Sequence, residues 1–132
     1  MNERTVDGGI WSDALTSVPG KSPSREAVVR LIAERFPYKA YCLVEDWIVF
    51  ESALTQDELE KVQSAGHIPF FIFAYKVVHD SSGRFQAGDW VRSSMCISSH
   101  DGYMFETKST VYVLMGDGHE MLASLKTIFS FF

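Results

Sequence analysis

The segment FFIFAYKVV, residues 70–78, most constrains how this chain can fold, because it is apolar at almost every position. Successive side chains of a β-strand point to opposite faces, so a strand of this composition presents apolar groups on both faces. Such a strand has to be covered on both sides. We therefore predict a central sheet strand here, in a chain of 132 residues that is long enough for one domain with a substantial core.

The segment LTQDELEKVQSAG, residues 54–66, carries the clearest local signal in the chain. Thr55 and Glu58 have the spacing of a capping box, in which each side chain bonds a free backbone N–H at the start of a helix. Gly66 suits the position just beyond the helix end, where a left-handed conformation is common. We predict a helix over residues 55–65.

An amphipathic pattern also covers residues 23–36. Ser22 suits the N-cap, and Pro23 suits the first helical position because its missing N–H would have no partner there. Pro37 disfavours continuation of the helix. We predict a second helix over this range, with its apolar face on the core.

The remaining elements follow from the distribution of apolar residues. Residues 41–52 are rich in β-branched and aromatic types, and they predict either one bent strand or a hairpin that turns at Glu45–Asp46. The apolar spacing in HEMLASLKTIFSFF predicts a C-terminal helix over residues 119–132. Further strands are predicted over residues 89–98, 103–108 and 110–115.

This order of elements predicts an α+β domain over residues 23–132, preceded by an irregular N-terminal arm over residues 1–22. The gaps between the strands are short, which favours an antiparallel meander. We therefore predict a single domain with an antiparallel sheet of about four to six strands, covered by about two to three helices.

The charge balance and the cysteines limit the class of protein. Acidic residues outnumber basic residues by 17 to 12, and the net charge of −5 argues against a nucleic-acid-binding face and favours a basic protein partner. Cys42 and Cys96 lie far apart among apolar residues, which predicts buried free thiols. We see no signal-peptide pattern and no apolar run long enough to cross a bilayer, so we expect a cytoplasmic protein without membrane contact.

The stretch VYVLMGDGHE places Gly116, Asp117, Gly118 and His119 directly after an apolar strand. A glycine turn between a strand and a helix is where many proteins bind phosphate. This turn lacks the lysine of a Walker loop and the third glycine of a dinucleotide loop, and Asp117 would repel a phosphate. We predict a tight strand-to-helix turn, and small-ligand binding at these four residues is the alternative.

Two patterns in the sequence bear on metal binding. Three of the four histidines precede an acidic residue, but none of these pairs has the i, i+4 spacing that places two ligands on one helix face, so we predict no metal site and no cofactor. Asp89 with Glu106 and Lys108 resembles the Asp…Glu-x-Lys arrangement of metal-dependent phosphodiesterases, in which two carboxylates hold Mg²⁺ and the lysine steadies the attacking water. These three residues are the catalytic candidates of an alternative function, a small metal-dependent hydrolase or nuclease.

Aromatic residues make up 14% of the chain and suggest a contact surface. Trp90 and Arg92 share one face of a predicted strand, and these residue types often anchor protein interfaces. Phe131 lies off the apolar stripe that Phe129 and Phe132 continue, so it is free to face a partner. With Trp11 on the N-terminal arm, they are the candidate partner-binding residues, and the partner is another protein or a second copy in a homodimer.

The run FETKSTVYVLMGDGHE, with GDWVRSS before it, resembles a family of short, uncharacterised proteins from proteobacteria and their phages or prophages. The similar stretch covers residues 70–127. The resemblance implies no activity, cofactor or catalytic residues. What it implies is a small accessory gene that is linked to phages.

The catalytic patterns are incomplete, and we therefore expect no enzymatic activity. We predict a cytoplasmic protein-binding module, either a phage-encoded inhibitor of a host or defence protein or a toxin-neutralising protein. The alternatives are the metal-dependent hydrolase and a small-ligand sensor with its pocket near Gly116.

Overall fold

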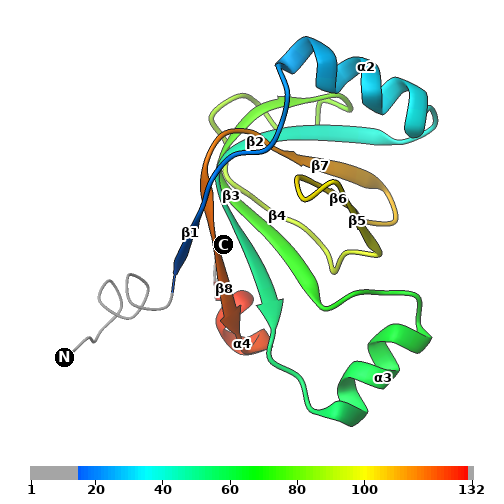
Figure 1. Ribbon diagram of the computed structural model, residues 1–132, viewed down its shortest axis with the longest axis vertical. Helices are drawn as coiled ribbons and strands as arrows, with labels where there is room; N and C mark the ends of the chain where they lie inside the picture. Colours follow the sequence, from blue (N-terminus) through cyan, green and yellow to red (C-terminus); the bar gives the residue numbers. More distant parts are fainter. Residues whose placement is uncertain (1–14, 131–132) are drawn as a thin grey trace, which may run out of the picture.

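The computed structural model describes residues 15–130, which form one α+β domain built around a curled sheet of eight strands (Figure 1). The helices are α2 (Arg25–Arg35), α3 (Gln56–Ser64) and α4 (Leu125–Ile128). The strands are β1 (Thr16–Val18), β2 (Ala40–Ser52), β3 (Phe70–Asp80), β4 (Val91–Arg92), β5 (Ser98–His100), β6 (Met104–Glu106), β7 (Thr110–Leu114) and β8 (Gly118–Ala123).

The long strand β2 organises the sheet. On one side it pairs antiparallel with β3, and on the other side it runs parallel to β7 with its first half and parallel to β8 with its second half. Beyond these neighbours, β6 and β5 extend the sheet from β7, and β1 pairs with β8. The sheet is therefore mixed, and the prediction of an antiparallel sheet with about four to six strands is wrong in direction and strand number.

Strand β2 also settles the choice between a bent strand and a hairpin. It is one strand of 13 residues, and Asp46 at its centre has a φ of 52°. Its register with β3 shifts between Leu43 and Val44, and such a bulge increases local bending and twist. The bend curls the sheet so that its two halves enclose part of the core.

The C-terminal segment differs from the prediction. Residues 119–123 of the helix predicted over residues 119–132 belong instead to β8 (Gly118–Ala123). Up to residue 130, the helical part of this range is Leu125–Ile128, with Ser124 as the N-cap. In β8 the side chains of Met121 and Ala123 are buried and that of Leu122 is exposed, which is the period-two pattern of a strand. Pairing with the distant strand β2 overrides the helical spacing of the apolar residues in this segment.

Helix α3 confirms the helix that we predicted over residues 55–65 from its capping box. Thr55 Oγ1 accepts from the backbone N–H of Glu58, and Glu58 Oε1 accepts from the backbone N–H of Thr55, so the capping box is complete. Gly66 has a φ of 84°, the left-handed conformation expected beyond the helix end. No residue of α3 is buried, and Figure 1 shows the helix standing away from the sheet.

Two predictions about the N-terminal part need correction. Helix α2 begins later than predicted, because Ser24 and not Ser22 caps it, with the Ser24 hydroxyl accepting from the N–H of Ala27 at 3.3 Å. The arm that we expected to be irregular contains β1, which forms because its backbone groups pair with the outer edge of β8. Residues 1–14 lie outside the described residues.

The later strands are shorter than predicted. Of residues 89–98, Val91–Arg92 form β4 and Ser98 begins β5. The chain between them still follows β3, since Cys96 N–H donates to the carbonyl of Phe70 and the Ser93 hydroxyl accepts from the N–H of Ile72. Residues 103–115 form two short strands, β6 and β7, joined in a hairpin.

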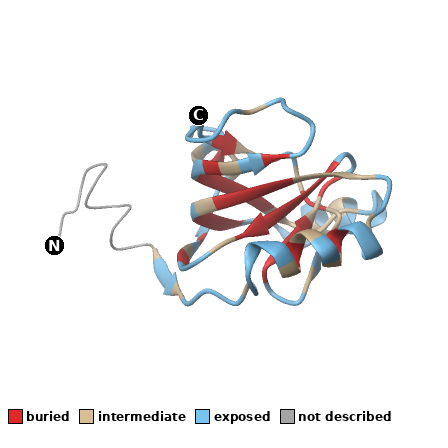
Figure 2. Cartoon of the chain, turned by 90° about the horizontal axis from the view of Figure 1, so that it is seen from above, coloured by how far each residue is buried: buried red, intermediate tan, exposed pale blue. Residues whose placement is uncertain are grey.

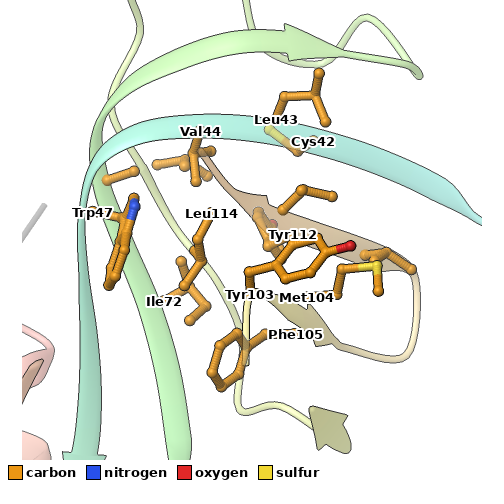
Figure 3. Packing of buried hydrophobic residues seen from close by; sticks show 14 of the residues in the cluster. Cys42, Leu43, Val44, Trp47, Ile72, Tyr103, Met104, Phe105, Tyr112 and Leu114 are labelled. Atoms are coloured by element: carbon orange, nitrogen blue, oxygen red, sulfur yellow. The ribbon is translucent and has the colours of Figure 1, made fainter. Parts of the chain in front are cut away.

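The core has two parts, on opposite sides of the sheet. The larger part fills the inside of the bend, where Trp47, Ile72 and Leu114 approach one another, and it continues under α2 through Val28 and Ile32 (Figure 3). The smaller part lies on the outer face of β2, β3 and β8, where Ile128 of α4 packs. Figure 2 shows that the buried positions concentrate on the sheet, whereas the helices keep exposed outer faces. Cys42 and Cys96 are buried free thiols, as predicted.

The loop after β3 is organised around the buried side chain of Asp80. Its Oδ2 accepts hydrogen bonds from the backbone N–H groups of Arg84 at 2.7 Å and Phe85 at 3.1 Å, and from the Ser82 hydroxyl at 3.1 Å. The Arg84 guanidinium lies 3.6 Å from Oδ1 and donates to Thr110 Oγ1 at 2.9 Å. Asp80 therefore fixes both the loop and its attachment to β7.

Candidate functional site

The glycine loop joins two strands, so the predicted strand-to-helix turn is wrong. Gly116 has a φ of 70°, and Asp117 Oδ1 accepts the backbone N–H of Gly20 at 2.6 Å. The indole N–H of Trp47 donates to the carbonyls of Met115, at 3.2 Å, and Gly116, at 3.1 Å. These contacts fasten three segments of the chain at the interruption between β7 and β8.

Gly118 is required by the packing of Trp47. A Cβ atom at Gly118 would lie 2.2 Å from Cδ2 of the indole ring, far inside van der Waals contact. The indole therefore lies directly against the backbone at the start of β8. The absence of a side chain at Gly118 is thus explained by its contact with Trp47, without a bound ligand.

A shallow hollow of about 360 Å³ lies beside this junction, lined by Asp117, Gly118, His119 and residues 17–19. The structure thus brings three of the four predicted ligand-binding residues to one hollow. One carboxylate oxygen of Asp117 is already used by Gly20. Small-ligand binding at this loop stays a prediction.

The structure does not group Asp89, Glu106 and Lys108 as a catalytic set. Asp89 lies in the turn before β4, where Oδ2 accepts the N–H of Gln86 at 2.9 Å. Glu106 lies in β6, and β7, β2 and β3 separate its strand from β4 in the sheet. Lys108 is exposed in the turn after β6. Among residues 15–130, no group of three or more His, Cys, Asp or Glu side chains is arranged to hold a metal ion.

Glu106 belongs instead to a polar network with Lys39, Ser98 and His100. Lys39 Nζ donates to Oε2 at 2.5 Å and to the carbonyl of Thr107 at 2.6 Å. The Ser98 hydroxyl donates to Oε1 at 2.6 Å and lies 2.8 Å from His100 Nε2. The network ties the start of β2 to the β5–β6 edge.

This network differs from a nucleophilic triad. In a triad the imidazole accepts the serine proton with one nitrogen and faces the carboxylate with the other. Here Nε2 of His100 faces both Ser98 and Glu106, the latter at 3.3 Å, and the serine proton points to the carboxylate. The arrangement neutralises and positions a carboxylate, and it does not activate Ser98.

Partial burial would raise the pKa of Glu106, but hydrogen bonds from Lys39, Ser98 and His100, with the charge of Lys39, hold this pKa below its usual value. A depressed pKa stabilises the fold above the unfolded pKa of about 4.3, and that stabilisation is lost as the pH falls through the folded value. Glu106→Gln should therefore lower the free energy of unfolding by about 1–2 kcal/mol at pH 7, and by less in acid. Urea unfolding at pH 7 and at about pH 3, well below the unfolded pKa, checks this, and an equal loss at both pH values would contradict it.

The other notable feature lies on the outer face of the sheet, where three aromatic side chains and one arginine gather, namely Tyr75, Trp90, Phe129 and Arg92. We call this group the aromatic surface, and its Tyr75 and Trp90 rings lie against buried Phe73. The Trp90 ring stacks on Phe73 with centroids 6.2 Å apart, and the Tyr75 ring meets Phe73 edge-on at 4.9 Å. The Arg92 guanidinium carbon lies 5.0 Å above the Phe129 ring. The exposed fractions of Tyr75, Trp90 and Phe129 are 57%, 49% and 50%.

The aromatic surface includes two of the four residues predicted to bind a partner. Trp90 and Arg92 lie on one face, as their alternation indicated, while Trp11 and Phe131 lie outside the described residues. Sequence reasoning missed Tyr75 and placed Phe129 in the buried stripe of a helix. Tyr75 follows Phe73 by two positions on β3, so period two was the signal that could have found it.

These features define a single-domain α+β protein with a curled mixed sheet and an exposed aromatic surface. The chain belongs to the family described as Domain of unknown function (DUF6957), which matches residues 19–130. The predicted resemblance to an uncharacterised family is confirmed in this form. No curated protein and no solved structure matches the chain. Within residues 15–130, none of the helices has the length and apolar character needed to span a membrane.

Proposed function

We propose that this chain is a protein-binding module and that the aromatic surface contacts its partner. The observation that supports this proposal is the gathering of three half-exposed aromatic rings beside Arg92 on one face of the sheet. Tyr, Trp and Arg supply much of the binding energy of protein interfaces. Tyr and Trp do so because they bury a large area at a low cost in conformational entropy.

The buried residues beneath the aromatic surface also favour a role in protein binding. Phe73 is 3% exposed and supports both the Trp90 and Tyr75 rings from below, while Phe71 supports Phe129 edge-on at 5.4 Å. Rings that are held by contacts within the protein lose little freedom on binding, which preserves affinity. The net charge of −5 disfavours nucleic-acid bases as the stacking partners of these rings.

The double variant Tyr75→Ser/Trp90→Ser should lose the partner proteins that the wild-type chain retains from a lysate of its own source cells. Tyr38→Ser is the matched control, because Tyr38 is 99% exposed and lies outside the aromatic surface. Quantitative mass spectrometry of the retained proteins, with thermal unfolding of each variant, checks the result. Retention of the same proteins by the double variant and the control would count against the proposal.

A homodimer is the other arrangement that would cover these rings. Sedimentation of the wild-type chain separates the two cases, because self-association through the aromatic surface would give a dimer that Tyr75→Ser/Trp90→Ser dissociates. A monomer that retains a different protein supports the proposed function.

Inhibition of a host or defence protein and neutralisation of a toxin are the two forms of this function that we predicted from the sequence. Both stay predictions, as do a phage origin and a cytoplasmic location. Gene neighbours would distinguish them, since a phage operon favours the inhibitor and an adjacent toxin gene favours neutralisation.

A further inference from the structure

A groove of about 520 Å³ is lined in part by Val49 and Phe70, which pack on the core inside the bend of the sheet. It therefore lies on the concave face, opposite the aromatic surface, whose supporting Phe73 belongs to the outer core. Strand pairing defines this groove. Thr16, Glu120 and Val49 lie in one row across β1, β8 and β2, and Leu122, Glu51 and Phe70 lie in the next row across β8, β2 and β3. Residues paired directly across strands project to the same face, so both rows line one surface.

The groove combines apolar surface with negative charge. Leu122 is 63% exposed and lies in the same row as Glu51 and Phe70, so it gives the groove an apolar surface. Glu51 and Glu120 are exposed diagonal neighbours on this face. Within residues 15–130, no lysine, arginine or histidine lines the groove, and no hydrogen bond or ion pair reaches either carboxylate.

We propose that this groove binds an arginine- or lysine-bearing segment of a partner protein, with the cationic group between Glu51 and Glu120. The stems of arginine and lysine are apolar and would cover Leu122 and Phe70, while their charged ends reach the carboxylates. Arginine fits best, because its planar guanidinium donates two parallel hydrogen bonds to a carboxylate. The inference does not rest on the aromatic surface, since it concerns the opposite face.

Charge complementarity also disfavours the two occupants of the groove that the protein itself could provide, namely residues 1–14 and a second copy of the chain. Residues 1–14 carry three acidic side chains and one basic side chain, namely Glu3, Asp7, Asp13 and Arg4, so their net charge has the same sign as the groove. A second copy of the chain brings a further net charge of −5 to an acidic surface. A basic segment of a different protein is therefore the occupant that fits.

The test uses a fluorescent, acetylated seven-residue peptide in which two arginines flank a leucine, titrated with the full-length chain and followed by anisotropy. The double variant Glu51→Gln/Glu120→Gln should weaken binding by about fivefold to tenfold. Leu122→Ser should weaken it as well, because the arginine stems lose their apolar contact. Replacing both arginines of the peptide by glutamine should abolish binding.

The matched control is Glu26→Gln/Glu60→Gln, which makes the same change in net charge on exposed positions of α2 and α3. This control should change the affinity by less than about twofold, because charges beyond a Debye length of ~10 Å are screened. Equal weakening by both double variants would overturn the proposal, since binding would then follow net charge alone. Argininamide that binds as tightly as the peptide would also overturn it, by showing a site for a small cation.

Failure of this proposal is distinguishable from failure of the proposed function. The groove variants leave Tyr75 and Trp90 in place, and the aromatic variants leave Glu51 and Glu120 in place. The absence of any peptide binding would remove the groove as a docking site, and the lysate experiment on the aromatic surface would be unaffected.

Discussion

Gly118→Ala should lower the free energy of unfolding by about 3 kcal/mol or more, which is at or above the upper end of the usual cost of overpacking. The added Cβ would lie 2.2 Å from Cδ2 and 2.4 Å from Cε2 of Trp47, so the indole ring or the start of β8 has to move. The ring cannot move without breaking its hydrogen bonds to the carbonyls of Met115 and Gly116. Urea unfolding followed by tryptophan fluorescence measures the loss.

Gly116→Ala is the matched control, two positions earlier in the same loop. A Cβ at Gly116 would meet no atom within 4 Å, but its φ of 70° is unfavourable for alanine. The expected cost is therefore only about 1–2 kcal/mol, the usual cost of a left-handed conformation with a side chain. Similar losses for the two variants would contradict the view that Gly118 is required by contact with Trp47.

Asp80→Ala should lower the free energy of unfolding by about 2–4 kcal/mol. The substitution leaves the part-buried backbone N–H groups of Arg84 and Phe85 without their acceptor. A fully buried donor that loses its partner costs about 1–3 kcal/mol, so each of these two donors contributes toward the lower end of that range. It also removes the negative charge that faces the Arg84 guanidinium. Asp89→Ala is the control, because Asp89 is exposed and accepts one backbone hydrogen bond.

The pH dependence of Asp80 gives an independent check on the same contacts. Burial would raise the pKa of Asp80, but hydrogen bonds from the Phe85 and Arg84 N–H groups and from Ser82, with the charge of Arg84, hold this pKa below its usual value. The carboxylate therefore stabilises the fold above the unfolded pKa of about 3.9, and this contribution is lost as the pH falls through the folded value. Asp80→Asn should flatten the loss of stability in acid, and an unchanged pH profile would contradict this.

The aromatic surface and the Glu106 network differ in how far the sequence could predict them. Trp90 and Arg92 were found on one face because alternation along a strand is a local property of the chain. Glu106 was singled out, but its partners come from two other segments, Lys39 from directly before β2 and Ser98 and His100 from β5. Their proximity depends on the order of strands in the sheet. The acidic groove was missed for the same reason, since Glu51 and Glu120 meet only because β2 and β8 are neighbours.

The sequence by itself determined the features that depend on a few consecutive residues. Thr55 and Glu58 cap α3 through contacts within one helical turn, and Gly66 ends it. The apolar run at residues 70–78 forms a strand, and its residues 71–74 are buried on both faces of the sheet.

Only the tertiary structure decided the direction of the sheet, the strand at residues 118–123 and the position of the groove. Each of these depends on β2 pairing in parallel with β7 and β8, where Ala40 meets Thr110 and Ile48 meets His119. The periodicity of a strand indicates which of its side chains are buried, but it does not indicate which distant strand it pairs with. Met121 and Ala123 of β8 are buried in the core on the outer face of the sheet, together with Phe50 of β2. Their burial and the pairing with β2 therefore outweigh the local helical preference of the C-terminal segment.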